Sequence, residues 1–214
     1  MKFDNINTTS VSNDHKTVTV TIDEKAAAGN YEVIIELLVQ AQSQSLKTTT
    51  IDDVKKKSGG VVASGQERIL VIKQNSEKQP MEIKLTDEQT SLLEIRDAIN
   101  KAEGNVTASL VKIKEGEHQL ILTLEKTGTD SAMDIEVKGD STLDAFLGYQ
   151  SSTASAGGHH NQQMKQTIAA KNAEIEINGI KIVRPSNEIK DTPEGVTFKL
   201  IKTSEKDVNN KSPY

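Results

Sequence analysis

The residues whose types could support catalysis or metal binding are scattered along this chain. His159 and His160 are adjacent, whereas His15 and His118 lie far away in the sequence. Adjacent histidines do not share one face of a helix, and no Asp or Glu stands near this pair to complete a metal site. The pair therefore indicates an exposed linker rather than a metal centre.

Glycine and aspartate clusters give no better candidates. Gly59-Gly60 and Gly157-Gly158 lack the strand–glycine–helix setting and the Lys of a phosphate-binding loop. Asp52-Asp53 and the stretch from Asp130 to Asp134 lack the spacing of a calcium loop. The sequence contains no Gly-x-Ser-x-Gly motif, and its carboxylates are scattered among lysines. We therefore predict no catalytic residue, no cofactor-binding residue and no metal ligand.

Composition narrows the class of protein. The formal net charge of -5 argues against a general nucleic-acid or anionic-membrane surface. The basic run Lys55-Lys56-Lys57 follows Asp52-Asp53 and is typical of a solvated loop. The chain has no cysteine, so disulfides, thiolate metal sites and thiol nucleophiles are excluded. Aromatic content is only 3%, so the cores must be built from Ile, Leu and Val, which favours two small cores over one deep one.

Targeting signals are missing from the sequence. No apolar run approaches the length needed to span a membrane, and Met1-Lys2-Phe3-Asp4 is not the start of a signal peptide. We therefore expect a cytosolic protein, a protein exported without a cleaved leader, or a piece of a longer chain. An extracellular protein without disulfides would need another source of stability, such as assembly.

The clearest structural signal is the segment from Glu174 to Val183. Its Asn178-Gly179 dipeptide predicts a two-residue hairpin, because both turn positions require positive φ. Folding the segment there gives one apolar face and one charged face, and the apolar face needs a cover. The predicted cross-strand pairs are Ile177 with Ile180, Ile175 with Ile182, and Glu176 with Lys181.

Further strands are predicted by runs in which apolar residues alternate or β-branched residues dominate. In the second of these runs, Tyr31, Val33, Ile35 and Leu37 are expected to share one side. The predicted strands cover residues 17–22, 31–39, 67–73, 81–85, 106–113, 119–124, 134–137 and 196–201.

One main helix is predicted by its pattern. Ser91 with Glu94 three residues on forms a capping box, and Gly104 is placed to end the helix. Residues 142–147 are expected to form a helical turn. The apolar positions of the main helix, at spacings of three and four, are Leu92, Ile95, Ile99 and Ala102.

These elements predict an α+β chain, mostly β, in two small β-rich lobes with one inserted in the other. Residues 1–49 and 164–214 form a discontinuous lobe, because the N-terminal strand pair is too short to be stable alone. Residues 50–163 form the inserted α+β lobe, with the main helix at about 91–103. A plain sequential split near residue 160 is the alternative.

The polar segments are expected to form loops and linkers. Residues 1–16 are polar and turn-rich and are expected to be poorly ordered. Residues 151–163 are of low complexity and are expected to form a linker. The stretch from Leu37 to Leu46 has two interpretations, a surface for a partner protein or the end of a strand that enters a loop. Its composition favours the second.

A weak internal repeat links the two lobes. The strand at 81–85 is followed by Ser91, an Ile-Arg-Asp triplet and a Gly-Asn-Val-Thr segment. The hairpin at 174–183 is followed by Ser186, an Ile-Lys-Asp triplet and a Gly-Val-Thr segment. The gaps differ, and Pro193 excludes a full helix in the second copy. A shared hairpin–connector–strand unit and coincidence both remain open.

Three segments in order resemble one family. The run from Asn172 to Ile182 resembles the "hook IN" motif of bacterial flagellar axial proteins, and the likeness continues to Thr197. Residues 28–43 and 93–109 resemble the middle of the flagellar filament-capping family, also called hook-associated protein 2. The order and spacing agree across roughly residues 26 to 200.

The resemblance implies a structural protein without catalysis, located outside the cell at the tip of the bacterial flagellum. It implies a ring-like cap of several copies that promotes the insertion of flagellin, so that flagellin and other copies of the chain are the partners. A host surface is a further partner, whereas nucleic acid and membrane are not expected. An extracellular adhesin-like module and a hook–filament junction protein with the same motif are the alternatives; an enzyme is disfavoured.

The family's helical leg has no counterpart in this sequence. That leg is a coiled coil formed by the two ends of the family's chains, and no sustained heptad pattern flanks the β-rich region here. We therefore expect the chain to be the middle portion of a longer protein.

Overall fold

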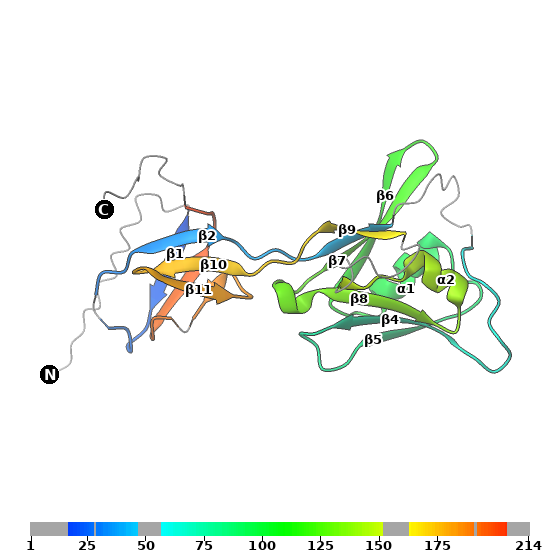
Figure 1. The fold of residues 1–214 in the computed structure, drawn as a ribbon, viewed down its shortest axis with the longest axis horizontal. Coiled ribbons are helices and arrows are strands. Elements are labelled where there is room, and N and C mark those ends of the chain that lie inside the picture. Colours follow the sequence, from blue (N-terminus) through cyan, green and yellow to red (C-terminus); the bar gives the residue numbers. More distant parts are fainter. Residues whose placement is uncertain (1–16, 28, 47–56, 152–162, 191, 205–214) are drawn as a thin grey trace. The chain divides into compact units, whose positions relative to one another are not determined.

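The computed structural model describes residues 17–27, 29–46, 57–151, 163–190 and 192–204. Strands dominate these residues and two α-helices accompany them, which confirms the predicted α+β, mostly β class. The chain divides into two compact units. The first unit consists of residues 1–39 and 171–214, and the second consists of residues 40–170 (Figure 1).

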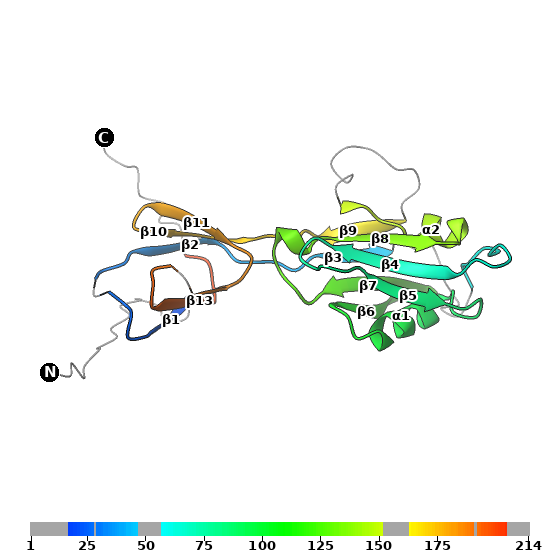
Figure 2. The same ribbon diagram turned by 90° about the horizontal axis from the view of Figure 1, so that it is seen from below.

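The first unit packs two three-stranded antiparallel sheets against each other. Their inward side chains form one aliphatic core around Phe198, with Ile35, Ile175 and Ile189 among its fully buried members. Figure 2 shows these sheets as two layers. One sheet has the order β1 (Val18–Ile22), β13 (Val196–Leu200), β12 (Glu188–Ile189), and the other has the order β11 (Ile180–Arg184), β10 (Ala173–Ile177), β2 (Val33–Leu37).

The predicted Asn-Gly hairpin joins β10 to β11. Asn178 and Gly179 have φ values of 50° and 81°, the left-handed conformation that this turn requires. The ladder pairs the residues that the sequence predicts, from Ile177 with Ile180 onward. Asn178 also extends the pairing of β10 with β2. Its N–H donates to the Glu32 carbonyl at 3.0 Å, and its Oδ1 accepts the Glu32 N–H at 2.8 Å.

One predicted face on β2 needs correction. Val33 and Ile35 point toward the core as expected, but Leu37 is 38% exposed. The ladder between β2 and β10 shifts register between Glu174 and Ile175, which inserts an extra residue into β2. Because such a bulge reverses the alternation of side chains, Leu37 lies on the solvent face.

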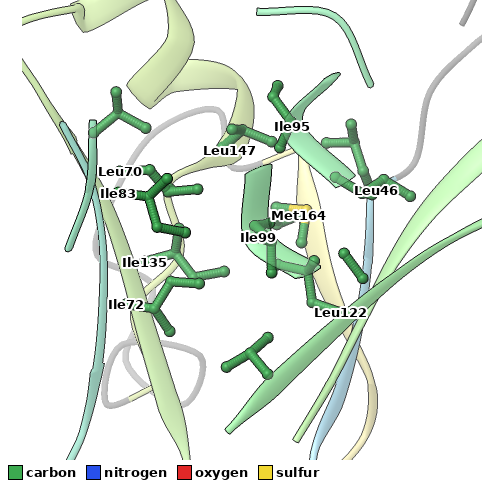
Figure 3. Packing of buried hydrophobic residues seen from close by; sticks show 14 of the residues in the cluster. Leu46, Leu70, Ile72, Ile83, Ile95, Ile99, Leu122, Ile135, Leu147 and Met164 are labelled. Atoms are coloured by element: carbon green, nitrogen blue, oxygen red, sulfur yellow. The ribbon is translucent and has the colours of Figure 1, made fainter. Parts of the chain in front are cut away.

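The second unit also places its core between two sheets. Figure 3 shows Leu70, Ile72 and Ile135 on one side of this core, and Leu122 with Met164 on the other. The four-stranded sheet has the order β6 (Val106–Lys114), β7 (Glu117–Leu124), β3 (Ser43–Leu46), β9 (Met164–Ile168). The three-stranded sheet has the order β5 (Met81–Leu85), β4 (Arg68–Gln74), β8 (Met133–Lys138).

Helix α1 (Leu92–Lys101) closes one side of this core. The predicted capping box is present, with the Glu94 N–H donating to Ser91 Oγ and the Ser91 N–H donating to the Glu94 carboxylate. Ile95 and Ile99 are buried in the core, and α1 contacts both β5 and β6. The helix ends at Ala102, and Glu103 rather than Gly104 takes the left-handed conformation that follows it.

Two short helices complete the second unit. Helix α2 (Ser141–Leu147) lies where a helical turn was expected and packs against β8. A 3-10 turn, η1 (Thr129–Ser131), precedes β8.

The division of the chain differs from the predicted boundaries at 49/50 and 163/164. Residues 43–46 form β3, and residues 164–168 form β9, although the first segment was expected to enter a loop. These two strands pair with each other, and β3 also pairs with β7. Their hydrogen bonds and their buried Leu46 and Met164 side chains therefore place both strands in the second unit.

Candidate functional site

The sequence-predicted candidates for chemistry do not converge in the structure. His118 lies half-buried on β7, Asp130 lies in η1, and Asp134 lies in β8. Among the described residues, no group of three or more His, Cys, Asp or Glu side chains is placed to hold a metal ion. The candidates His15, Asp52-Asp53, Gly157-Gly158 and His159-His160, together with Lys55-Lys56, lie outside the described residues.

Gly59 and Gly60 contribute to a buried ionic cluster rather than to a phosphate loop. A Cβ on Gly60 would lie 2.5 Å from Thr142 Oγ1, and a Cβ on Gly59 would lie 2.6 Å from the Thr90 methyl group. Only glycine allows the backbone to approach so closely. The Gly60 N–H donates to the Asp140 carboxylate at 2.8 Å.

The centre of this cluster is an ion pair between Arg68 and Asp140. Arg68 Nε donates to Asp140 Oδ2 at 2.7 Å, and the two side chains are 2% and 1% exposed. The remaining guanidinium nitrogens donate to Asp87 Oδ1 at 3.0 Å and to the Gly60 carbonyl at 2.9 Å. Asp140 also accepts the Leu143 N–H and so caps α2. The cluster therefore ties β4, the 57–60 segment and α2 together.

The pKa shifts in this cluster follow from its geometry. Burial raises the pKa of Asp140, but hydrogen bonds from the Leu143 N–H, the Arg68 guanidinium and the Gly60 N–H outweigh burial and lower the pKa below its ordinary value. Burial likewise lowers the pKa of Arg68, and its carboxylate partners outweigh this effect and raise the pKa. Both groups therefore stay charged at neutral pH. A pair locked in its charged state provides structural support rather than acid–base catalysis.

A shallow polar depression lies on the second unit. Its rim contains amide and hydroxyl side chains without a charged group. Beneath it, Gln42 Oε1 accepts the Met133 N–H at 2.7 Å, and Gln44 Nε2 lies 3.5 Å from the Met133 carbonyl. These two buried glutamines, one just before β3 and one within it, thus connect this segment to the start of β8. The depression is lined by Gln42, Asn75, Thr129, Ala132, Ser151, Gln166 and Ala170.

The outward faces of the sheets differ in chemical character. On the β5-β4-β8 sheet, Val71 is fully buried between Glu82 and Glu136, its neighbours on the adjacent strands. Exposed ion pairs cover this face, which is typical of a surface in contact with water. The pairs are Lys73 with Glu136, Lys138 with Glu82, and Lys84 with Glu67.

Exposed apolar side chains gather elsewhere. On the outward face of β11-β10-β2, Ile34, Leu37 and Val183 are 38% to 50% exposed. On β6, Val111 and Ile113 are 38% and 51% exposed. Exposed apolar side chains on strands mark candidate contact surfaces for other proteins. These side chains are therefore candidate docking surfaces on the described part of the molecule.

The buried Arg68–Asp140 pair was missed by sequence reasoning. One signal was present, since Asp140 precedes the segment 141–147 as an N-cap residue. Its partner could not be identified, because the two residues are far apart in the sequence and lie on different elements. The exposure of the side chains on β6 could not be predicted from the sequence either. Alternation of apolar and polar residues predicts a strand, but it does not predict that the strand lies at the edge of a sheet.

Comparisons with known proteins identify two matching family models. The model "Flagellar hook-associated protein 2 C-terminus" matches residues 170–211, and the model "Flagellin hook IN motif" matches residues 70–126. The second match differs from the placement of this motif at residues 172–182 in the sequence analysis. Both regions follow the same order of hairpin, connector and strand, β4–β5–α1–β6 in one and β10–β11–β12–β13 in the other.

Curated relatives and solved structures carry related names. Flagellar hook-associated protein 2 of Xenorhabdus nematophila is 47% identical over 211 residues, which is 95% of this chain and 42% of that protein. The protein of the same name from Salmonella typhimurium is 42% identical over 160 residues, 74% of this chain and 32% of that protein. The chain thus spans less than half the length of these relatives.

The solved structures that match most of the chain include two pairs of domains from flagellar cap proteins. The D2-D3 domains of the flagellar cap protein FliD from Escherichia coli superpose with a TM-score of 0.77 at 33% identity, covering 88% of this chain and 90% of that one. The corresponding domains from Serratia marcescens give a TM-score of 0.77 at 34% identity, covering 89% of this chain and 95% of that one.

No described helix in the present chain is long and apolar enough to cross a membrane.

Proposed function

Because the chain belongs to the flagellar hook-associated protein 2 family, we propose that it forms the head of a cap at the tip of the flagellar filament. Several copies of the full-length protein surround the tip, and the cap promotes the insertion of flagellin subunits. The observation that carries this proposal is the likeness to the D2-D3 domains of flagellar cap proteins over about nine-tenths of both chains.

The surfaces of the chain support a role in contact rather than catalysis. The buried ionic cluster supports the fold, and the described His, Asp and Glu side chains form no metal-binding group. Exposed apolar residues lie on β2, β6 and β11 instead. A cap that guides other subunits needs such contact surfaces on a rigid frame.

Deletion of the full-length gene tests this proposal. We expect loss of filament growth, with flagellin released into the medium, and restoration by the full-length gene in trans. Filament length is measured by electron microscopy and flagellin by immunoblot of the medium. Normal filaments in the deletion strain would contradict the proposal. In that case, loss of attachment to mucin would instead indicate an adhesin.

A further inference from the structure

The outer half of the β6–β7 hairpin stands free of the rest of its sheet. The ladder between β6 and β7 runs from Val106 with Leu124 out to Lys114 with Glu117. In contrast, β7 pairs with β3 only from Ile121 to Thr123. Residues 110–114 and 117–120 therefore form a two-stranded arm, which extends from the second unit in Figure 1.

The first half of β6 has a closed outer edge. Asn100 of α1 donates from Nδ2 to the Ala108 carbonyl at 2.9 Å, and Asn100 Oδ1 accepts the Ala108 N–H at 2.8 Å. The amide side chain thus occupies the backbone groups that Ala108 turns away from β7. In an antiparallel ladder, every second residue turns its N–H and C=O to the same side. Leu110 and Lys112 therefore direct theirs to the outer edge of the arm.

Two other edge strands in the described part of the chain, β2 and β8, are each closed at one position by reciprocal hydrogen bonds. On β2, Ser204 donates its N–H to the Ile35 carbonyl and accepts the Ile35 N–H on Oγ. On β8, Ile135 and Tyr149 exchange backbone hydrogen bonds at 2.7 and 2.9 Å. Proteins close their edges in this way to avoid unwanted pairing. In the arm, by contrast, β6 is an edge of its sheet and pairs only with β7 among the described strands.

The arm also exposes apolar side chains between lysines. Val111 and Ile113 are 38% and 51% exposed, and they alternate with Lys112 and Lys114. Each lysine forms an exposed ion pair, Lys112 with Glu115 at 2.7 Å and Lys114 with Glu117 at 3.0 Å. Exposed pairs of this kind contribute little, so the lysines can exchange these partners for other carboxylates.

The positive charge of Lys112 determines which kind of strand can pair with this edge. If two copies paired antiparallel through β6 around Lys112, each Lys112 would face its counterpart, and like charges directly opposite each other destabilise a sheet. A strand with Asp or Glu between apolar residues would instead place a carboxylate beside Lys112, whereas the register shift between Lys112 and Lys114 puts the Lys114 side chain on the other face. Charge complementarity therefore favours a foreign acidic strand over a second copy.

We propose that the outer edge of β6, from Leu110 to Lys114, binds an extended partner segment by strand addition. The partner is an incoming filament subunit that has not completed its fold, and the bound segment alternates acidic with apolar residues. Backbone groups of Leu110 and Lys112 provide the hydrogen bonds, while Val111 and Ile113 contact the partner's apolar side chains. This inference rests on the proposed cap function, because that function brings flagellin subunits to the cap for insertion.

Amide exchange in the present chain tests the edge directly. The probes are a short capped peptide in which Glu alternates with Val, and the same peptide with Lys in place of Glu. We expect the Glu peptide to slow exchange of the Leu110 and Lys112 amides by about fivefold or more at millimolar concentration, and the Lys peptide to have little effect. Equal slowing by both peptides, or no slowing at these amides, would overturn the proposal.

Variants at Lys112 distinguish the contribution of its backbone N–H from that of its side-chain charge. Lys112→Pro removes an outward N–H that β7 does not use, so the fold is retained and the Glu peptide no longer binds. Lys112→Gln is the matched control; it keeps the N–H and weakens binding only partly. If Lys112→Pro fails to fold, Lys112→Glu replaces it and must shift the preference toward the Lys peptide. Slowing that grows with protein concentration without any peptide would identify a second copy as the occupant and contradict the proposal.

The same variants in the full-length protein distinguish this inference from the cap function. With Lys112→Pro, we expect short filaments and flagellin in the medium, whereas Lys112→Gln supports longer filaments. Filaments of normal length with Lys112→Pro would overturn strand addition while leaving the cap function intact. Loss of filaments in the deletion strain remains the separate test of the cap function.

Discussion

At the residue scale, the buried pair of Arg68 and Asp140 dominates the electrostatics of the second unit. Truncating either side chain leaves the other charge buried without its main partner. We expect Arg68→Ala to lower the free energy of unfolding by about 3–5 kcal/mol. Urea unfolding followed by circular dichroism measures this loss. Glu136→Ala breaks the exposed pair with Lys73 and is the control, with an expected change of about 1 kcal/mol or less. Similar losses in the two variants would contradict this account.

The same pair predicts how stability depends on pH. The pKa of Asp140 is lower in the folded protein than its ordinary value of 3.8. A carboxyl with a lowered folded-state pKa stabilises the fold above the unfolded-state pKa, and this contribution is lost as the pH falls through the folded-state value. We therefore expect the free energy of unfolding to decrease below about pH 4, and less steeply in Asp140→Asn. Acid titrations of both proteins at fixed urea measure the slopes, and equal slopes would exclude Asp140 as a contributor.

Sequence reasoning was least informative at this scale. It excluded thiol chemistry from the absence of cysteine, which needs no structure. It assigned Gly59-Gly60 no role, although their close packing beside Asp140 makes glycine necessary there. The local sequence around these glycines does not indicate their neighbours, because Thr90, Asp140 and Thr142 come from distant parts of the chain.

At the element scale, the β10–β11 hairpin shows how a turn residue can serve two strands. Asn178 adopts positive φ and also bonds Glu32, the residue before β2. Asn178→Gly removes the side-chain bond without adding strain, with an expected loss of about 1 kcal/mol. Asn178→Ala loses the same bond and also replaces Asn with a residue that tolerates positive φ less well, so we expect a loss of about 2 kcal/mol. Thermal unfolding of the two variants measures both losses, and a glycine variant as stable as the parent would show that the side-chain bond adds nothing.

Elements with a strong local pattern were predictable from the sequence. The hairpin register and the capping box of α1 agree with the structure, because each depends on residues that are close in the chain. Strands β3 and β9 were not predicted. β3 reads Ser-Gln-Ser-Leu, and its buried polar residues are stabilised by β7, β8 and β9 rather than by their own neighbours in the sequence.

At the scale of the whole molecule, the division into two units predicts which fragments fold. Residues 40–170 retain β3 and β9, so we expect this fragment to fold alone, with dispersed amide resonances and cooperative unfolding. Residues 50–163 match the boundaries expected from the sequence but lack two of the four strands in one sheet. This shorter fragment should be largely unfolded, because Leu46 and Met164 are missing from its core. Equal stability of the two fragments would contradict the structural boundaries.

The pairing of β1 with β13 affects the order in which the two units of the molecule fold. Val18 lies opposite Leu200, so the first described strand of the chain pairs with the last described one. Ribosomal synthesis begins at the N-terminus, and β1 must wait while every strand of the second unit emerges. Residues 40–170 can therefore reach their native state first. The first unit stays open until the last strand arrives, and its folding rate reflects the entropy lost in closing so long a loop.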